Sequence, residues 1–302
     1  MQTRFLAGHI CAVALSITAL TVEANEVTLR HQGLMLNANL ELAAGKQPAD
    51  GVILITHGGL AHRGTESLVY LQRLLNDKGY STLAINLSLG LDNRHDMYEC
   101  QVTHRHRNTD AADEIGVWVD WLKQQGAKRV TLLGHSRGGA QTALYAAEHD
   151  NTLVNSIVLL APAIRENTGA AGYQQRYHKP LAPVLEKARQ LVKNGQGDAV
   201  LEHIGLLNCP DTSATANSFV SYYGQEARVD TPSLLPKLRK PTLVVVAGGD
   251  EVVAGLDKKV ASLADGTRVR MKIIDGADHT FRDLYTDDAV EAIDAFLKDI
   301  RD

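Results

Sequence analysis

A serine, an aspartate and a histidine each follow a short apolar run of the sequence. Ser136 lies in the hexapeptide GHSRGG, Asp250 in AGGDEV and His279 in DGADHT. A serine hydroxyl is a weak nucleophile unless a base accepts its proton and a carboxylate orients that base. The three residues therefore predict a catalytic triad that attacks an acyl bond, with Ser136 as nucleophile, His279 as base and Asp250 as orienting acid.

The glycines around Ser136 have a steric purpose. The GHSRGG motif stands between the apolar run 130–133 and the helix-like segment 140–148, which is the strand–turn–helix context of a nucleophile elbow. Neighbours without a Cβ let the backbone fold tightly enough for a strained serine to project from the end of the strand.

Strand-like and helix-like patterns alternate along the chain. Runs that are apolar on both faces are typical of buried parallel strands, and helices between them provide the crossovers. The alternation predicts an α/β fold with a doubly wound, mostly parallel sheet, whose carboxyl edge carries the three residues. We expect an antiparallel hairpin at 27–42, further strands at 51–56, 81–86, 129–133, 156–161, 242–247 and 269–274, and helices at 68–75, 111–122, 139–148, 256–263 and 289–300.

The alternation is interrupted between Ala163 and Thr231, where a single helix would normally connect two strands. The segment 181–193 has helical periodicity, and 208–217 is polar and loop-like. We expect a small helical cap insertion at about 164–231 over one end of the sheet. Its aromatic residues suggest that the cap shapes a pocket of moderate size: Tyr173, Tyr177, Phe219, Tyr222 and Tyr223.

The first residues have the pattern of an export signal. An apolar run at 5–22 precedes a small-residue site, which predicts a signal peptide at 1–24 and a single mature domain at 25–302. The alternative is an uncleaved membrane anchor, because the run approaches the length that spans a bilayer. We expect cleavage, no stable membrane span afterwards, and a periplasmic or secreted protein.

Cleavage would remove Cys11 and leave Cys100 and Cys209 in an oxidising compartment. An even pair there suggests one disulfide, and the alternative is two unrelated buried thiols. A bridge would join the cap to the segment that carries Cys100 and would close a long loop. The chain-entropy model values such a bridge at about 4 to 5 kcal/mol.

The chain resembles the α/β-hydrolase family through the GHSRGG motif and the order serine, aspartate, histidine over nearly the whole predicted mature domain. The resemblance implies an acyl-enzyme mechanism without a cofactor or a metal. It also implies an oxyanion hole built from the N–H of Arg137 and an N–H of the His57 loop, from Gly59 or else Leu60. His57 itself would brace that loop.

Two carboxylates depart from the usual pattern of the family. Asp278 stands where the family often has glycine, and Glu251 is adjacent to Asp250. Side chains of adjacent residues point in different directions, so Glu251 cannot replace Asp250 in the same geometry. We therefore keep Asp250 as the orienting acid.

The segment His104-Arg105-His106 concentrates basic and imidazole groups after a predicted strand. Three interpretations are open. The histidines could be metal ligands, although His-x-His without further ligands is a weak signal. The segment could be a solvated basic loop, or it could contact an anionic or polar group of the substrate.

Charge and composition limit the remaining function classes. The net charge of −4 and the scattered basic residues give no sign of a nucleic-acid partner. The expected partner is a small acyl substrate with an ester-like bond. A thioesterase, peptidase or acyltransferase would use the same triad, and a non-catalytic binding protein on this fold is the alternative of another class.

Overall fold

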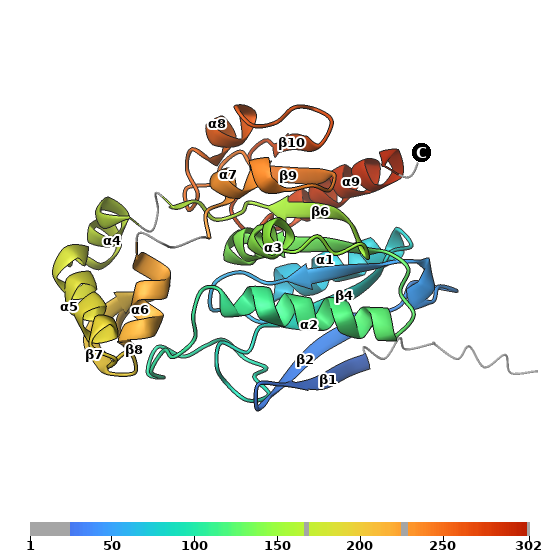
Figure 1. The fold of residues 1–302 in the computed structure, drawn as a ribbon. Helices are drawn as coiled ribbons and strands as arrows, with labels where there is room; N and C mark the ends of the chain where they lie inside the picture. Colours follow the sequence, from blue (N-terminus) through green and yellow to red (C-terminus); the bar gives the residue numbers. More distant parts are fainter. Residues whose placement is uncertain (1–24, 166–168, 225–228, 301–302) are drawn as a thin grey trace, which may run out of the picture.

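The computed structural model describes residues 25–165, 169–224 and 229–300, so the predicted signal peptide lies outside the described residues. Its centre is an eight-stranded sheet with the strand order β1-β2-β4-β3-β5-β6-β9-β10 (Figure 1). The strands from β4 to β10 in this order run parallel, and β2 joins β4 in the antiparallel sense. The strands are β1 (Asn25–His31), β2 (Leu34–Glu41), β3 (Val52–Thr56), β4 (Ser81–Asn86), β5 (Val130–His135), β6 (Val154–Leu160), β9 (Thr242–Ala247) and β10 (Val269–Ile274).

Burial explains why the sequence pattern located these strands. Every residue of β3, β4 and β9 is buried, as expected of strands with helices on both faces. The antiparallel hairpin is also confirmed. Gln32 and Gly33 both have positive φ, 47° and 85°, which suits the tight turn between β1 and β2.

Helices cover both faces of the sheet. Figure 1 shows α2 and α3 packed together in front of it, and α1 and α9 packed together behind it. The doubly wound α/β fold is thus confirmed, although α9 begins earlier than expected. The helices around the sheet are α1 (Glu66–Asp77), α2 (Asp110–Gln124), α3 (Ser136–Glu148), α7 (Thr231–Leu234), α8 (Leu256–Ala261) and α9 (Leu284–Asp299), with short 3-10 turns at Pro48–Asp50 and Leu235–Lys237.

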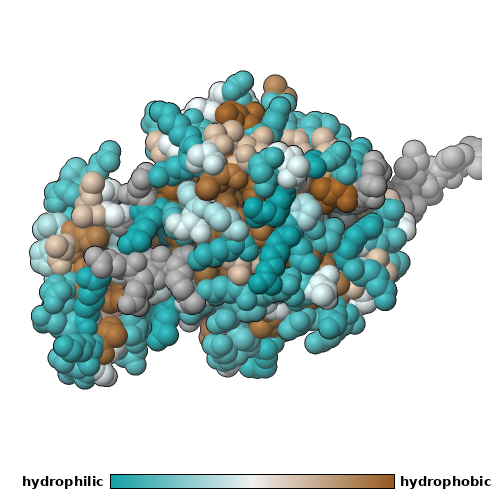
Figure 2. Space-filling model, turned by 45° about the horizontal axis from the view of Figure 1, so that its top comes forward, coloured by the Kyte–Doolittle hydropathy of each residue, from teal (hydrophilic) through white to brown (hydrophobic). Residues whose placement is uncertain are grey.

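The segment between β6 and α7 forms a cap that stands apart from the sheet, and it is a separate lobe at the left of Figure 2. The prediction of a loop at 208–217 is wrong, because Cys209–Thr215 is a strand that pairs with Val200–Leu206. Its residues are mostly polar, so a search for apolar runs missed this strand. The cap elements are α4 (Ala170–Tyr177), α5 (Leu181–Lys193), β7 (Val200–Leu206), β8 (Cys209–Thr215) and α6 (Ala216–Tyr223).

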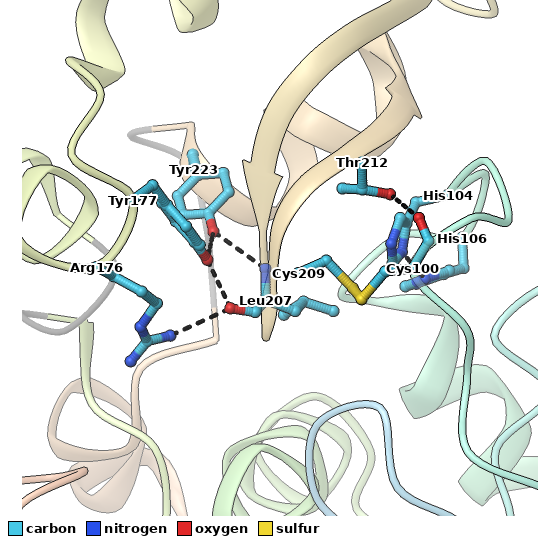
Figure 3. Close-up of a disulfide and its surroundings, with 9 residues drawn as sticks. All are labelled: Cys100, His104, His106, Arg176, Tyr177, Leu207, Cys209, Thr212 and Tyr223. Carbon is cyan, nitrogen blue, oxygen red and sulfur yellow. Dashed lines mark hydrogen bonds between the residues drawn. A yellow bond between two sulfur atoms is a disulfide. The ribbon is translucent and has the colours of Figure 1, made fainter.

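A disulfide between Cys100 and Cys209 fastens the cap to the segment between β4 and α2, with an S–S distance of 2.00 Å (Figure 3). Around it, the backbone N–H of His104 donates to Ser213 O at 2.8 Å, and the hydroxyl of Thr212 donates to Cys100 O at 2.6 Å. The cap is therefore held by a covalent bond and by hydrogen bonds to the same segment.

No helix within the described residues combines the length and the apolar character needed to cross a bilayer.

Removal of the disulfide should destabilise the fold. In a Cys100→Ala/Cys209→Ala variant, the free energy of unfolding in urea should fall by about 2 to 5 kcal/mol, because the closed loop restricts the unfolded chain. Reduction of the wild-type protein should give the same loss. Equal stability of the oxidised protein and the variant would contradict this role.

Candidate active site

Ser136 occupies the junction between β5 and α3. The strand ends at His135, the helix begins at Ser136, and Ser136 has a positive φ of 55°. The turn is possible because glycines let backbones approach. A Cβ on Gly138 would lie 2.2 Å from His57 O, and a Cβ on Gly58 would lie 2.8 Å from Ser136 Cβ. The predicted elbow is thus present, and its sharp turn raises the serine hydroxyl above the strand.

Ser136, His279 and Asp250 form a continuous hydrogen-bonded line. Ser136 Oγ lies 2.8 Å from His279 Nε2, and His279 Nδ1 lies 2.7 Å from Asp250 Oδ2. The other oxygen of Asp250 accepts hydrogen bonds from the N–H groups of Val252 and Val253. Glu251 is exposed, so Asp250 is the carboxylate that contacts the imidazole.

The environment of Asp250 favours its ionised form. Burial alone would raise the pKa, but the hydrogen bond and charge of His279, with the N–H groups of Val253 and Val252, outweigh burial and lower it below the usual value. The ionised carboxylate keeps the Nδ1 proton of His279 directed toward it, so Nε2 can accept the proton of Ser136 Oγ.

The loop after β3 lies beside the serine. Gly59 has a positive φ of 50°, and within the described residues neither Gly59 N nor Leu60 N donates a backbone hydrogen bond. The N–H of Arg137 lies in the first turn of α3, where helices leave N–H groups without an intrahelical partner. These are the three predicted oxyanion donors, and all three residues line the cavity beside Ser136.

That cavity has a volume of about 540 Å³ and includes Ser136 and His279 in its wall. The cap contributes Arg176, Leu207 and Asn208, which the sequence did not mark as cavity residues. The remaining wall is mainly apolar: Leu60, Ala61, Leu68, Met97, Ala163, Ile164, Val252 and Val253. The hydroxyl of Ser136, paired with His279, thus faces a cavity that could hold a small molecule with both apolar and polar parts.

A model of the family described as serine aminopeptidase, S33, matches residues 47–282. The chain belongs to this family of α/β hydrolases. Est1E from Butyrivibrio proteoclasticus is 20% identical over 91% of this chain and 98% of its own, with a TM-score of 0.61. The α/β hydrolase GrgF from Penicillium sp. sh18 is 15% identical over 92% of this chain and 97% of its own, with a TM-score of 0.65.

A dienelactone hydrolase from Anabaena variabilis is also similar to this hydrolase. The two are 20% identical over 91% of this chain and 97% of the other, with a TM-score of 0.55. At these identities the solved structures show that the fold is shared.

His135 is a residue of this hydrolase that the sequence did not single out. Its Nε2 lies 2.8 Å from His279 O, and its N–H donates a hydrogen bond to that carbonyl. Burial, followed by the charge of His279, lowers the pKa of His135 to about 4, so the ring is neutral near pH 7. His135, the last residue of β5, thereby holds the loop that carries His279. The position of His135 directly before Ser136 is the sequence signal that could have identified it as part of the site.

His57 braces the loop after β3, as the sequence indicated. Its Nε2 accepts hydrogen bonds of 3.1 Å from Leu87 N and from Arg94 Nη2, which places the ring proton on Nδ1. Burial, followed by the charge of Arg94, lowers the pKa of His57 to about 3. Arg94 is itself buried and also donates to Leu87 O, so the loop rests on a fixed polar network.

The interpretation of His104-Arg105-His106 as a solvated loop is wrong for the two histidines, which are buried against the cap. His104 Nδ1 lies 3.0 Å from His106 Nε2, and His106 Nδ1 lies 2.8 Å from Tyr222 OH. Within the described residues, no third metal-ligating side chain joins them. None of the three lines the cavity beside Ser136, because the cap packs over the histidines and leaves Arg105 exposed outside it.

The aromatic residues of the cap also have another role than the expected one. Four of them contact one another in edge-on or tilted geometry: Tyr173, Tyr177, Phe219 and Tyr223. Tyr222 instead contacts His106 edge-on, and none of the five lines the cavity beside Ser136.

Glu114 of α2 binds the segment that follows β4. It is 5% exposed and accepts hydrogen bonds from Ser88 N at 2.9 Å and Ser88 Oγ at 2.5 Å. Burial raises its pKa to about 7, although the bonds from Ser88 oppose the rise.

The raised pKa of Glu114 predicts a pH-dependent stability. Because the folded state binds this proton more tightly than the unfolded state, the free energy of unfolding should fall as pH rises from about 4.5 to 7. Glu114→Gln should remove roughly 3 kcal/mol of that decline. Urea titrations across this range measure it, with the exposed Glu99→Gln as control. Identical pH profiles for Glu114→Gln and wild type would refute the assignment.

Proposed function

We propose that the chain is a serine hydrolase that cleaves an ester-like bond of a small substrate through an acyl-enzyme. The observation that carries the proposal is the continuous contact from Ser136 Oγ through His279 to Asp250, with 2.8 and 2.7 Å between the paired atoms. The serine end of this line opens into a cavity rather than into the core.

The first step is attack by Ser136 Oγ on the carbonyl carbon while His279 Nε2 takes the hydroxyl proton. Asp250 stabilises the imidazolium and fixes the tautomer with the proton on Nδ1. The negative charge that develops on the carbonyl oxygen is stabilised by the N–H of Arg137 and the N–H of Gly59, with Leu60 as the alternative donor.

The second step releases the acyl group. His279 gives its proton to the leaving alcohol, then removes a proton from a water molecule that attacks the acyl-enzyme. Product acid departs and Ser136 regains its proton. The same groups would cleave a thioester or transfer the acyl group to another acceptor. The use of water as the acyl acceptor is therefore part of the proposal.

The charges of the cavity favour an ester over a peptide with a free N-terminus. An aminopeptidase has to accommodate the ammonium group of its substrate, and a carboxylate is the complementary group. The described wall of the cavity contains two arginines and no aspartate or glutamate. This distribution repels an ammonium group near the serine.

The cellular location of the protein is also part of the proposal. Disulfides persist in oxidising compartments, so the Cys100–Cys209 bond supports a periplasmic or secreted hydrolase.

Replacement of the nucleophile should abolish turnover. Ser136→Ala should lower kcat for p-nitrophenyl butyrate by at least about 10⁴-fold while the fold, judged by thermal unfolding, is retained. Ser67 lines the same cavity without a base beside it, so Ser67→Ala is the matched control and should retain activity within about threefold. Turnover by Ser136→Ala would reject the proposed nucleophile.

The two neighbouring carboxylates should differ in their effect. Asp250→Asn should lower kcat by about 10³- to 10⁴-fold, because an amide no longer fixes the productive tautomer of His279. Glu251→Gln should change kcat by less than about threefold, since that side chain is exposed. Equal losses in the two variants, measured with the same ester, would exclude Asp250 as the orienting acid.

A further inference from the structure

The cavity beside Ser136 carries an unbalanced positive charge. Among the residues in its described wall, Arg137 and Arg176 have cationic side chains, and no wall residue is acidic. Uncompensated guanidinium groups in a concave site attract anions from solution. The imbalance distinguishes this wall from the protein as a whole, whose net charge is −4.

Arg176 extends from α4 of the cap toward the turn between β7 and β8 (Figure 3). Its Nη1 donates to Leu207 O over 3.4 Å, and no carboxylate of the described residues forms an ion pair with it. A guanidinium has five N–H donors in a planar fork. The contact with Leu207 occupies one donor and leaves the others for a ligand.

The turn that positions Arg176 is firmly built. Leu207 O also accepts a 2.6 Å hydrogen bond from Tyr177 OH, and Leu207 N donates to Tyr223 OH. Cys209, two residues further, is bridged to Cys100. A guanidinium held against such a turn loses little conformational freedom when it binds a ligand.

Arg137 is held in a different way. Its guanidinium carbon lies 5.4 Å from the centre of the Tyr222 ring, and no carboxylate of the described residues pairs with it. The aromatic face orients this cation under the cap. Its charge adds to that of Arg176 without neutralising it.

We propose that the substrate is an ester with a carboxylate at the end remote from the scissile bond, and that Arg176 binds this carboxylate. The inference rests on the proposed hydrolase function. The apolar residues of the cavity wall accommodate the hydrocarbon part of such a molecule, and the planar fork matches a carboxylate in two hydrogen bonds. Arg176 is thereby a specificity residue that does not take part in bond cleavage.

Matched substrate pairs test the proposal. Mono-p-nitrophenyl glutarate and p-nitrophenyl pentanoate differ by a carboxylate on the acyl side, and 4-acetoxybenzoate and 4-methylphenyl acetate differ on the alcohol side. The wild-type enzyme should prefer the charged member of at least one pair. Arg176→Gln should raise KM for that member by about tenfold or more, because at least one charge-assisted hydrogen bond is lost, and leave KM for the neutral member within about twofold.

Lys187→Gln is the control, because it removes the same charge from the exposed surface of α5, away from the cavity. It should leave both members of each pair unchanged. The subsite is overturned if no pair shows a preference for charge, or if Arg176→Gln affects charged and neutral members equally.

A binding measurement separates this inference from the proposed function. The ligand is chosen by the pair that shows the preference: monomethyl glutarate for the acyl side, or 4-acetoxybenzoate for the alcohol side. It should bind to Ser136→Ala in calorimetry, and the additional change Arg176→Gln should weaken binding by about tenfold. If no ester is cleaved but this difference appears, the hydrolase mechanism fails and the carboxylate subsite stands. If esters are cleaved and the difference is absent, the subsite alone fails.

Discussion

The left-handed backbone conformation of Ser136 is the constraint on which the site depends. Such a conformation costs a residue with a side chain about 1 to 3 kcal/mol, and it persists only where the surroundings impose it. Here the surroundings are two backbones in direct contact, because a Cβ on Gly138 would lie 2.2 Å from His57 O. The contact joins the elbow to the loop after β3, so the serine and the N–H groups of that loop are packed as one unit.

Both sides of this unit are reinforced by groups outside the proposed catalytic triad. Beneath it, His57 and Arg94 connect the loop to the segment after β4, while His135 binds the loop of His279. Above it, the disulfide and the pairing of β8 with the segment around His104 hold the cap, which delivers a cation to the cavity wall. The proposed chemistry belongs to the lower half of the site, and the proposed selection of substrate charge belongs to the cap.

The sequence predicted the features that depend on local pattern. Continuous apolar runs located the parallel strands, and the order of Ser136, Asp250 and His279 brought three distant residues to one edge of the sheet. Features that depend on tertiary packing were missed. The polar strand β8 has no apolar run, the burial of His104 follows from the cap that covers it, and the place of Arg176 in the wall follows from the orientation of α4.

The central claim is that Ser136 is an activated nucleophile, and covalent labelling tests it most directly. The protein is treated with a fluorophosphonate, digested, and the modified peptide is identified by mass spectrometry. The account predicts modification of the peptide that contains Ser136, and loss of the modification in His279→Ala, since the hydroxyl then lacks its base. Unmodified Ser136 in the wild-type protein, or a label on another residue, would contradict the account.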